Sequence, residues 1–163
     1  MKPPSSDIEI KNKVVIFTIS LLTFLLLTYL LWLCLRTVNI IDVHEDRNFS
    51  HVLVKNFPIT DRGKINWWLK NKDMLQRRYN IPQPDSDGDF TVIIWGFGEG
   101  YKQQGDESKD DRFCFVDFHT PKNCIDKNKE FYLTYSRNTG INFITDSTIY
   151  RIDKSGKFVK KSN

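Results

Sequence analysis

The cysteines and histidines of this 163-residue chain are the residue types best suited to metal binding, redox chemistry or nucleophilic catalysis. Cys114 and Cys124 flank His119, and Cys34 lies inside a long apolar run. Two thiols and one imidazole fall short of the four ligands of a structural zinc site, and the cysteines lack the Cys-x-x-Cys spacing of redox enzymes. We therefore expect a Cys114–Cys124 disulfide, worth ~2 to 3 kcal/mol in an oxidising compartment, with two buried reduced thiols as the alternative.

Two other segments resemble ligand-binding loops without having their spacing. The run Gly96 to Gly100 follows an expected strand, yet Tyr101 stands where a dinucleotide fingerprint needs its third glycine. The run Asp85 to Asp89 alternates carboxylates as a calcium loop does at its start, but its twelfth position is Gly96 instead of a bidentate Glu. We expect turns at both places, with no metal and no cofactor.

Nucleophilic catalysis has no recognisable signature in the chain. Gly-x-Ser-x-Gly and Ser-x-x-Lys are absent, and a disulfide would consume the two thiols nearest His119. His44 and His51 follow the apolar run and are expected at the polar surface. A solvated loop is expected to hold four acids: Asp106, Glu107, Asp110 and Asp111. The sequence therefore predicts no enzyme. The formal net charge of +4 is too small for a nucleic-acid-binding domain.

The longest apolar run of the chain extends from Val14 to Leu35 and contains no charged side chain. As a helix it would reach ~33 Å, enough to cross a hydrocarbon core of ~30 Å. It is longer than the apolar core of a signal peptide and ends on bulky instead of small residues. We expect an uncleaved membrane anchor, with a cleaved signal as the alternative. Tyr29 and Trp32 are expected at the far interface of the bilayer.

Basic residues are more frequent before the run than after it. Lys2, Lys11 and Lys13 precede it, and only Arg36 and Arg47 follow closely. Because positive charge favours the cytoplasmic side, we expect the N-terminus inside and the domain outside. The expected organisation is a cytoplasmic N-terminus at 1–13, a transmembrane helix at 14–35 and a periplasmic domain at 36–163.

The outer part alternates β-rich runs with one helical segment. The runs expected as strands are 38–43, 51–57, 90–95, 112–118, 130–136, 141–145, 147–153 and 157–160. Thr60 to Tyr79 is expected as a helix that begins at Thr60 or Asp61 and stops before Pro82. An exposed charged loop is expected at 96–111, and a hairpin turn at 154–157. This order predicts an α+β domain, a mostly antiparallel sheet with the helix on one face.

The expected helix has two apolar faces. Its core-facing stripe comprises Ile65, Trp68, Leu69, Leu75 and Tyr79. Trp67 and Met74 lie on roughly the opposite side, close to three basic residues: Lys70, Arg77 and Arg78. Our hypothesis is that this second face contacts a protein partner or anionic lipid head groups. The alternative is that another segment, such as the 96–111 loop, covers Trp67 within the domain.

Several stretches of the chain are recognisable as a set. They are Val52 to Lys72, Arg78 to Pro82, Asp111 to Cys114, Asn123 to Asp126 and Ser136 to Asn138. Together they resemble a family of small enterobacterial membrane proteins of unknown function, over most of residues 15–160. The resemblance implies a single-pass inner-membrane protein with a periplasmic domain, and it implies no catalytic residues.

Two functions from different classes follow as hypotheses. The first is an envelope protein that binds a partner, for example an immunity-type protein that neutralises a toxin arriving in the periplasm. The second is an envelope enzyme or small-ligand receptor that uses His119 and the acidic loop. It requires a deep pocket joining His119 to Asp110 or Asp117. We favour binding over catalysis because the chain has no catalytic constellation.

Overall fold

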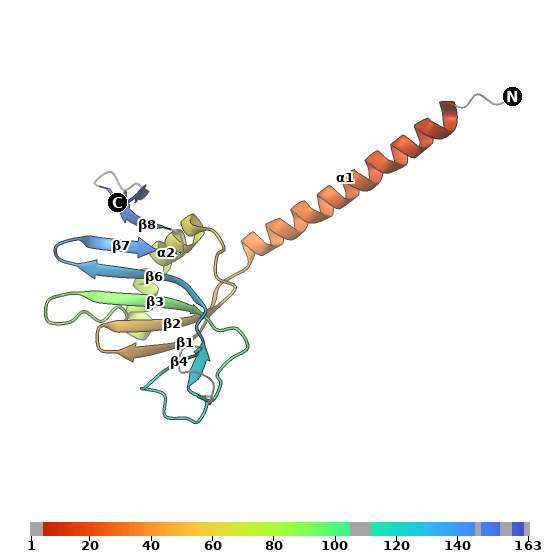
Figure 1. Ribbon diagram of the computed structural model, residues 1–163. Coiled ribbons are helices and arrows are strands. Elements are labelled where there is room, and N and C mark those ends of the chain that lie inside the picture. Colours follow the sequence, from red (N-terminus) through yellow and green to blue (C-terminus); the bar gives the residue numbers. More distant parts are fainter. Residues whose placement is uncertain (1–4, 105–111, 146–147, 154–157, 162–163) are drawn as a thin grey trace. The chain divides into compact units, whose positions relative to one another are not determined.

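The computed structural model describes residues 5–104, 112–145, 148–153 and 158–161 (Figure 1). The chain divides into two compact units, Met1–Thr37 and Val38–Asn163. The expected hairpin turn at 154–157 and the four acids expected in the solvated loop lie outside the described residues.

The first unit contains a single helix, α1 (Ser5–Leu35). Its segment Lys11–Leu33 is long and apolar enough to cross a membrane, by length and composition. Three threonine hydroxyls in this segment donate hydrogen bonds to carbonyl oxygens of the preceding turn: those of Thr18, Thr23 and Thr28. Such bonds satisfy polar side chains within the helix itself, as an apolar environment requires. The guanidinium of Arg36 lies 3.7 Å from the ring centroid of Trp32.

The second unit has the predicted α+β architecture. Its large sheet has the order β1-β2-β3-β6-β7-β8-β9. The strands are β1 (Asn39–Asp46), β2 (Phe49–Lys55), β3 (Phe90–Gly96), β6 (Lys129–Ser136), β7 (Gly140–Ile144), β8 (Ile149–Ile152) and β9 (Phe158–Lys160). Within it, β2 and β3 are parallel and every other neighbouring pair is antiparallel. The parallel pair requires a crossover, and helix α2 (Asp61–Tyr79) provides it.

Helix α2 has the predicted bounds, and its caps explain them. The Thr60 hydroxyl accepts a 3.1 Å hydrogen bond from the Gly63 N–H, which satisfies a free donor of the first turn. At the other end Asn80 is left-handed, with φ 56°, and its N–H donates to the Gln76 carbonyl. The buried residues of the helix are Lys64, Ile65, Trp68 and Leu75.

Strands β2 and β3 are buried on both faces of the sheet. One set of alternate residues, including Val52, Val54, Val92 and Ile94, packs with α2 in the main core. The other set, Leu53 and Trp95, packs in a second core with Phe115 and Ile125. This second core lies under a small sheet of two antiparallel strands, β4 (Arg112–Cys114) and β5 (Cys124–Asp126).

We call β4, β5 and the residues 115–123 between them the ribbon. The prediction of a strand from Arg112 to Phe118 was too long, because β4 ends at Cys114. Beyond it the chain leaves the extended ladder, and the ring of Phe115 is buried in the second core. The ribbon thus serves as a third layer over part of the sheet instead of extending the sheet.

Candidate functional site

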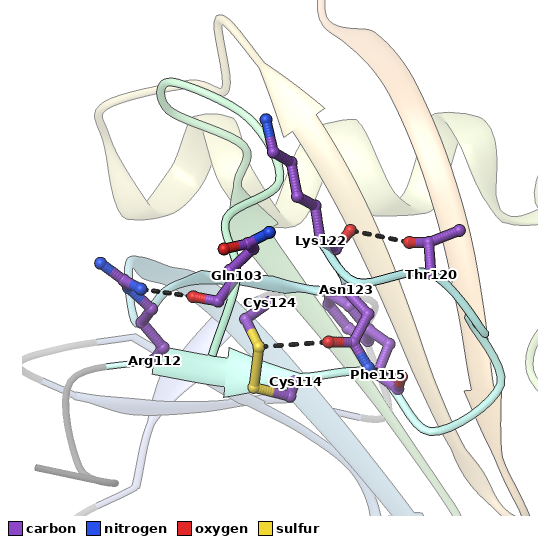
Figure 2. Close-up of a disulfide and its surroundings, with 8 residues drawn as sticks. All are labelled: Gln103, Arg112, Cys114, Phe115, Thr120, Lys122, Asn123 and Cys124. Atoms are coloured by element: carbon purple, nitrogen blue, oxygen red, sulfur yellow. Dashed lines mark hydrogen bonds between the residues drawn. A yellow bond between two sulfur atoms is a disulfide. The ribbon is translucent and has the colours of Figure 1, made fainter. Parts of the chain in front are cut away.

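The predicted disulfide between Cys114 and Cys124 is present, and it lies within the ribbon (Figure 2). The two residues face each other across β4 and β5, with Cα atoms 3.9 Å apart. Beside them the Phe115 N–H donates to the Asn123 carbonyl, and the Asn123 side-chain amide donates to the Phe115 carbonyl. Cys124 is fully buried, and its backbone also pairs with that of Lys102. The bond therefore fixes the ribbon itself and not a connection between strands of the large sheet.

Four polar side chains meet between the ribbon and strand β1, and we call them the His44 cluster: Asp42, His44, Tyr101 and Asp117. The Nδ1 atom of His44 lies 3.1 Å from both carboxylate oxygens of Asp117. Its Nε2 atom lies 2.6 Å from the Tyr101 hydroxyl oxygen. The same hydroxyl lies 2.8 Å from a carboxylate oxygen of Asp42. The result is a continuous hydrogen-bonded chain from Asp117 to Asp42.

Strand periodicity explains why two members of the cluster come from β1. Asp42 and His44 are two residues apart, so they lie on the same face of the sheet. Their partners across the ladder are Leu53 and His51, which share that face with the second core. The bulge between Ile40 and Asp42 shifts the register just before this point. The ribbon and the chain before it then supply Asp117 and Tyr101 from above this face.

Aromatic rings enclose His44, so the expectation of a surface histidine was wrong. Its ring stacks on Phe115, with centroids 4.0 Å apart and planes inclined by 15°. Phe118 and Tyr101 approach it at 5.4 and 5.8 Å. His44 is only 3% exposed. The sequence carried no local sign of this burial, because every enclosing ring lies more than fifty positions away.

The hydrogen bonds of the His44 cluster constrain where its hydrogen atoms lie. The Tyr101 hydroxyl has one hydrogen and two close partners, His44 Nε2 and Asp42. If it donates to the Asp42 carboxylate, His44 Nε2 must donate to the hydroxyl oxygen. Nδ1 must also carry a proton to donate to Asp117. In this arrangement both ring nitrogens of His44 face a carboxylate, Nδ1 directly at Asp117 and Nε2 through the Tyr101 hydroxyl at Asp42.

His51 is the second buried histidine of this region, and it is also a correction to the expected surface position. Its Nδ1 accepts a 3.1 Å hydrogen bond from the Trp95 indole N–H, and its ring packs on Phe113 at 4.8 Å. It is 5% exposed. Burial, and secondarily the positive charge of His44, lower the pKa of His51 from 6.5 to about 4. Burial therefore favours the neutral form of His51.

Two further groups of the region have shifted pKa values. Burial, followed by repulsion from Asp117, raises the pKa of Glu45. Burial also raises the pKa of the Tyr101 hydroxyl, and its hydrogen bond to Asp42 raises that pKa further. Both shifts favour the neutral form of the group beside the carboxylates of the cluster.

A pocket opens beside the cluster, but it is small. Its volume is about 30 Å³, and its lining includes His44, Glu45, His51, Phe113 and Asp117. This is room for about two water molecules, far below the volume of a small-molecule site. The arrangement can hold protons and ordered water, and it offers a metabolite no space.

The enzyme hypothesis would be favoured by a pocket that joins His119 to Asp110 or Asp117, and the pocket beside Asp117 does not include His119 in its lining. His119 is exposed, and it forms no hydrogen bond or ion pair with a described residue. Asp117 instead binds His44. Asp110 lies outside the described residues. Nor do three His, Cys, Asp or Glu side chains converge as metal ligands anywhere in the described ranges.

Both segments that resembled ligand loops contain turns. One carboxylate oxygen of Asp85 accepts hydrogen bonds from the N–H groups of Asp87 and Asp89, so its own backbone occupies it. Gly98 and Gly100 have φ values of 52° and 108°, which side chains with a Cβ rarely adopt.

The proposed second face of α2 is partly covered. Trp67 and Met74 are half-buried and pack against the main core. The ring of Trp67 meets that of Phe57 edge to face at 5.2 Å, so Phe57 covers this tryptophan. The three basic residues beside them, Lys70, Arg77 and Arg78, are exposed and form no ion pair with any described residue. Whether this face binds a partner stays a prediction.

A comparison with protein families gives one match that covers nearly the whole chain. Residues 9–162 match the model of a family described as "Enterobacterial putative membrane protein (DUF943)". No curated protein and no solved structure matches the chain significantly.

Proposed function

The chain belongs to the enterobacterial putative membrane protein family (DUF943), and from this premise we propose that it is an anchored binding protein of the bacterial envelope. In this proposal α1 spans the inner membrane once, and the α+β domain binds a protein partner in the periplasm. An immunity-type protein, which neutralises an incoming toxin, is the example that fits such a layout.

The disulfide supports the proposed location of the domain in the periplasm. Cys114 and Cys124 are bonded to each other at facing positions of the ribbon. Disulfides persist in the periplasm and are rare in the cytosol. The basic residues before the span, Lys11 and Lys13, favour the same orientation, with the N-terminus in the cytoplasm.

The closed state of the His44 cluster supports binding over catalysis. An active site needs an ionisable group that a substrate can reach. His44 is enclosed by rings, each of its nitrogens has a partner, and the adjoining pocket holds about 30 Å³. These features are those of a polar network that fixes the ribbon on the sheet.

The exposed side of α2 is our candidate for the partner-binding surface. Lys70, Arg77 and Arg78 provide exposed positive charge, and the half-buried Trp67 and Met74 provide an apolar flank. Basic groups around an apolar patch fit a partner with an acidic surface.

A topology reporter tests the compartment. Alkaline phosphatase fused after Asn163 should be active, and green fluorescent protein at the same place should be dark. Fusions after Lys13 in a chain truncated there are the control and should behave in the opposite way. An inactive phosphatase with a bright fluorescent fusion at Asn163 would overturn the periplasmic assignment.

Charge variants test the partner surface without disturbing the core. Lys70→Gln, Arg77→Gln and Arg78→Gln together should abolish crosslinking of the protein that the wild-type domain captures in the periplasm. The matched control removes three exposed lysines elsewhere: Lys122→Gln, Lys160→Gln and Lys161→Gln. Capture that is lost equally in both variants, or in neither, would contradict this surface. Trp67→Ala is less suitable because it also removes the contact with Phe57.

A further inference from the structure

The folded domain begins almost immediately after α1. The helix ends at Leu35, and the side chain of Val38 already packs against the main core. Only Arg36 and Thr37 lie between them. Three residue steps span about 10 Å at full extension, so the start of the domain cannot move farther than that from the end of the helix.

Four chain segments meet at this end of the domain. Asn39, the first residue of β1, pairs with Lys55, the last residue of β2. The next four residues lead to the N-cap of α2 at Thr60. Gly96, the last residue of β3, pairs with Val54 of β2, and its N–H donates to the carbonyl of Asn128, just before the start of β6. We call this region the tether end: residues 38–39, 55–62, 96–98 and 127–129.

The tether end presents one apolar side chain to solvent. Ile59 is 77% exposed, more than any other large apolar side chain that the structure describes. It stands in the short connection between β2 and α2, beside Pro58. Burying such a side chain in the interfacial region of a bilayer is favourable.

The same end of the domain carries positive charge, and two of its ammonium groups lie over aromatic rings, Lys55 over Phe97 and Lys129 over Tyr132. Four basic residues of the tether end are exposed and form no ion pair with a described residue: Lys55, Arg62, Lys127 and Lys129. The acids of this region have partners within the domain, and Asp61, in the tether end itself, accepts hydrogen bonds from the hydroxyls of Thr145 and Tyr150. Glu130 pairs with Lys64, and both Glu99 and Asp126 pair with Lys102.

We propose that the tether end docks on the anionic phospholipid head groups of the bilayer that anchors the chain. Ile59 enters the interface, and the four basic side chains contact lipid phosphates. Each basic residue near an anionic surface favours binding about fivefold. Because the tether keeps these residues close to the bilayer, weak contacts suffice. The inference rests on the membrane anchor of the proposed function but not on which side the domain occupies.

The opposite end of the domain lacks this combination. It carries the acidic turn at Asp85 to Asp89, which contacts Asn48 of the β1–β2 turn. Arg77 and Arg78 are at the C-terminal end of α2, about 24 Å along the helix from Arg62. Two other exposed arginines at this end, Arg47 of the β1–β2 turn and Arg137 just after β6, lie outside the proposed partner surface and provide a matched control.

The test uses the full chain in lipid nanodiscs of phosphatidylglycerol or of phosphatidylcholine. A Cys34→Ser background carries Ile59→Cys labelled with the fluorophore NBD, and a second sample carries the label at Ser86→Cys in the acidic turn. Spin-labelled lipid at head-group depth reports contact by quenching. We expect quenching at position 59 in phosphatidylglycerol, little in phosphatidylcholine, and none at position 86.

Charge variants then test whether the basic side chains of the tether end cause the contact with the lipid. Lys55→Gln with Arg62→Gln should lower the ratio of docked to undocked domain about twenty-five-fold, the product of two fivefold losses. Arg47→Gln with Arg137→Gln should leave the ratio unchanged. Raising the salt concentration to 0.5 M should weaken docking in the same way.

Each other outcome overturns the inference. Equal quenching in both lipids would exclude recognition of anionic head groups, and no quenching in phosphatidylglycerol would exclude docking. Protection of position 59 only after a periplasmic extract is added would assign the tether end to a protein partner instead. Protein that fails to stay with the discs contradicts the membrane anchor itself, whereas unquenched protein in stable discs contradicts only the docking.

Discussion

The imidazole Nδ1 of His44 lies 3.1 Å from each carboxylate oxygen of Asp117, a contact between residues 73 positions apart. Asp117 also accepts a hydrogen bond from the Glu45 N–H. His44 belongs to edge strand β1, and Asp117 belongs to the ribbon. The pair therefore fastens the disulfide-closed ribbon to the sheet, and it gives the ribbon two independent restraints.

Tyr101→Phe tests the other half of the cluster. The change removes a hydroxyl bonded to both His44 and Asp42, and it leaves a buried imidazole nitrogen without a partner. We expect a loss of about 1 to 3 kcal/mol in the free energy of unfolding, measured by urea denaturation in detergent. Tyr135→Phe, at an exposed tyrosine, is the control. Equal stabilities for the wild type and the Tyr101 variant would contradict a structural role of the cluster.

Stability should fall as pH decreases from about 6.5 to about 4. His51 has a folded pKa of about 4 against an ordinary 6.5. Between these values the unfolded chain binds a proton that the folded chain does not, so the free energy of unfolding rises with pH, by at most ~3 kcal/mol. Glu45 has the opposite effect. Because its pKa is raised in the folded chain, its contribution to the free energy of unfolding decreases as pH rises.

The measurement is urea unfolding at several pH values between 4 and 7, in a Glu45→Gln background that removes the opposing effect. His51→Asn keeps an acceptor for the Trp95 indole N–H but cannot titrate. We expect its stability to depend less on pH. Parallel curves for the two proteins would show that His51 is not responsible.

Loss of the disulfide should loosen the ribbon more than the sheet. Cys114→Ser with Cys124→Ser removes a cross-link between residues at a sequence separation of 10. In the chain-entropy account this cross-link stabilises the folded domain by about 3 kcal/mol. Amide hydrogen exchange should accelerate in residues 112–126 while β3 and β6 stay protected. Cys34→Ser is the control. Uniformly faster exchange throughout the domain would contradict a local restraint.

Lys64 and Glu130 should respond unequally to substitution. The Lys64 ammonium is buried, lies 3.5 Å from a Glu130 carboxylate oxygen and donates to the Glu130 carbonyl. Glu130→Ala leaves this charge without its counter-ion and should cost about 2 kcal/mol or more, whereas Lys64→Met removes the charge and should cost less than ~1 kcal/mol. Thermal unfolding of the two variants in detergent makes the comparison. A larger loss for Lys64→Met would reverse this interpretation.

Local sequence was sufficient to predict the two helices and the fold class of this protein. The run from Val14 to Leu35 predicted an apolar helix because hydrophobicity over a continuous segment needs no tertiary contact. Thr60 and Asn80 predicted the ends of α2 because caps bond to atoms within the same turn. The order of strands and helix then predicted an α+β domain with a mostly antiparallel sheet, and that class is correct.

Tertiary structure alone decided which residues meet. His44 and His51 looked like surface groups, yet a ribbon from a distant part of the chain covers their face of the sheet. Trp67 looked like an open face of a helix, yet Phe57 packs against it. Periodicity assigns a side chain to a face, but it cannot tell what covers that face, because coverage depends on contacts between residues far apart in the chain.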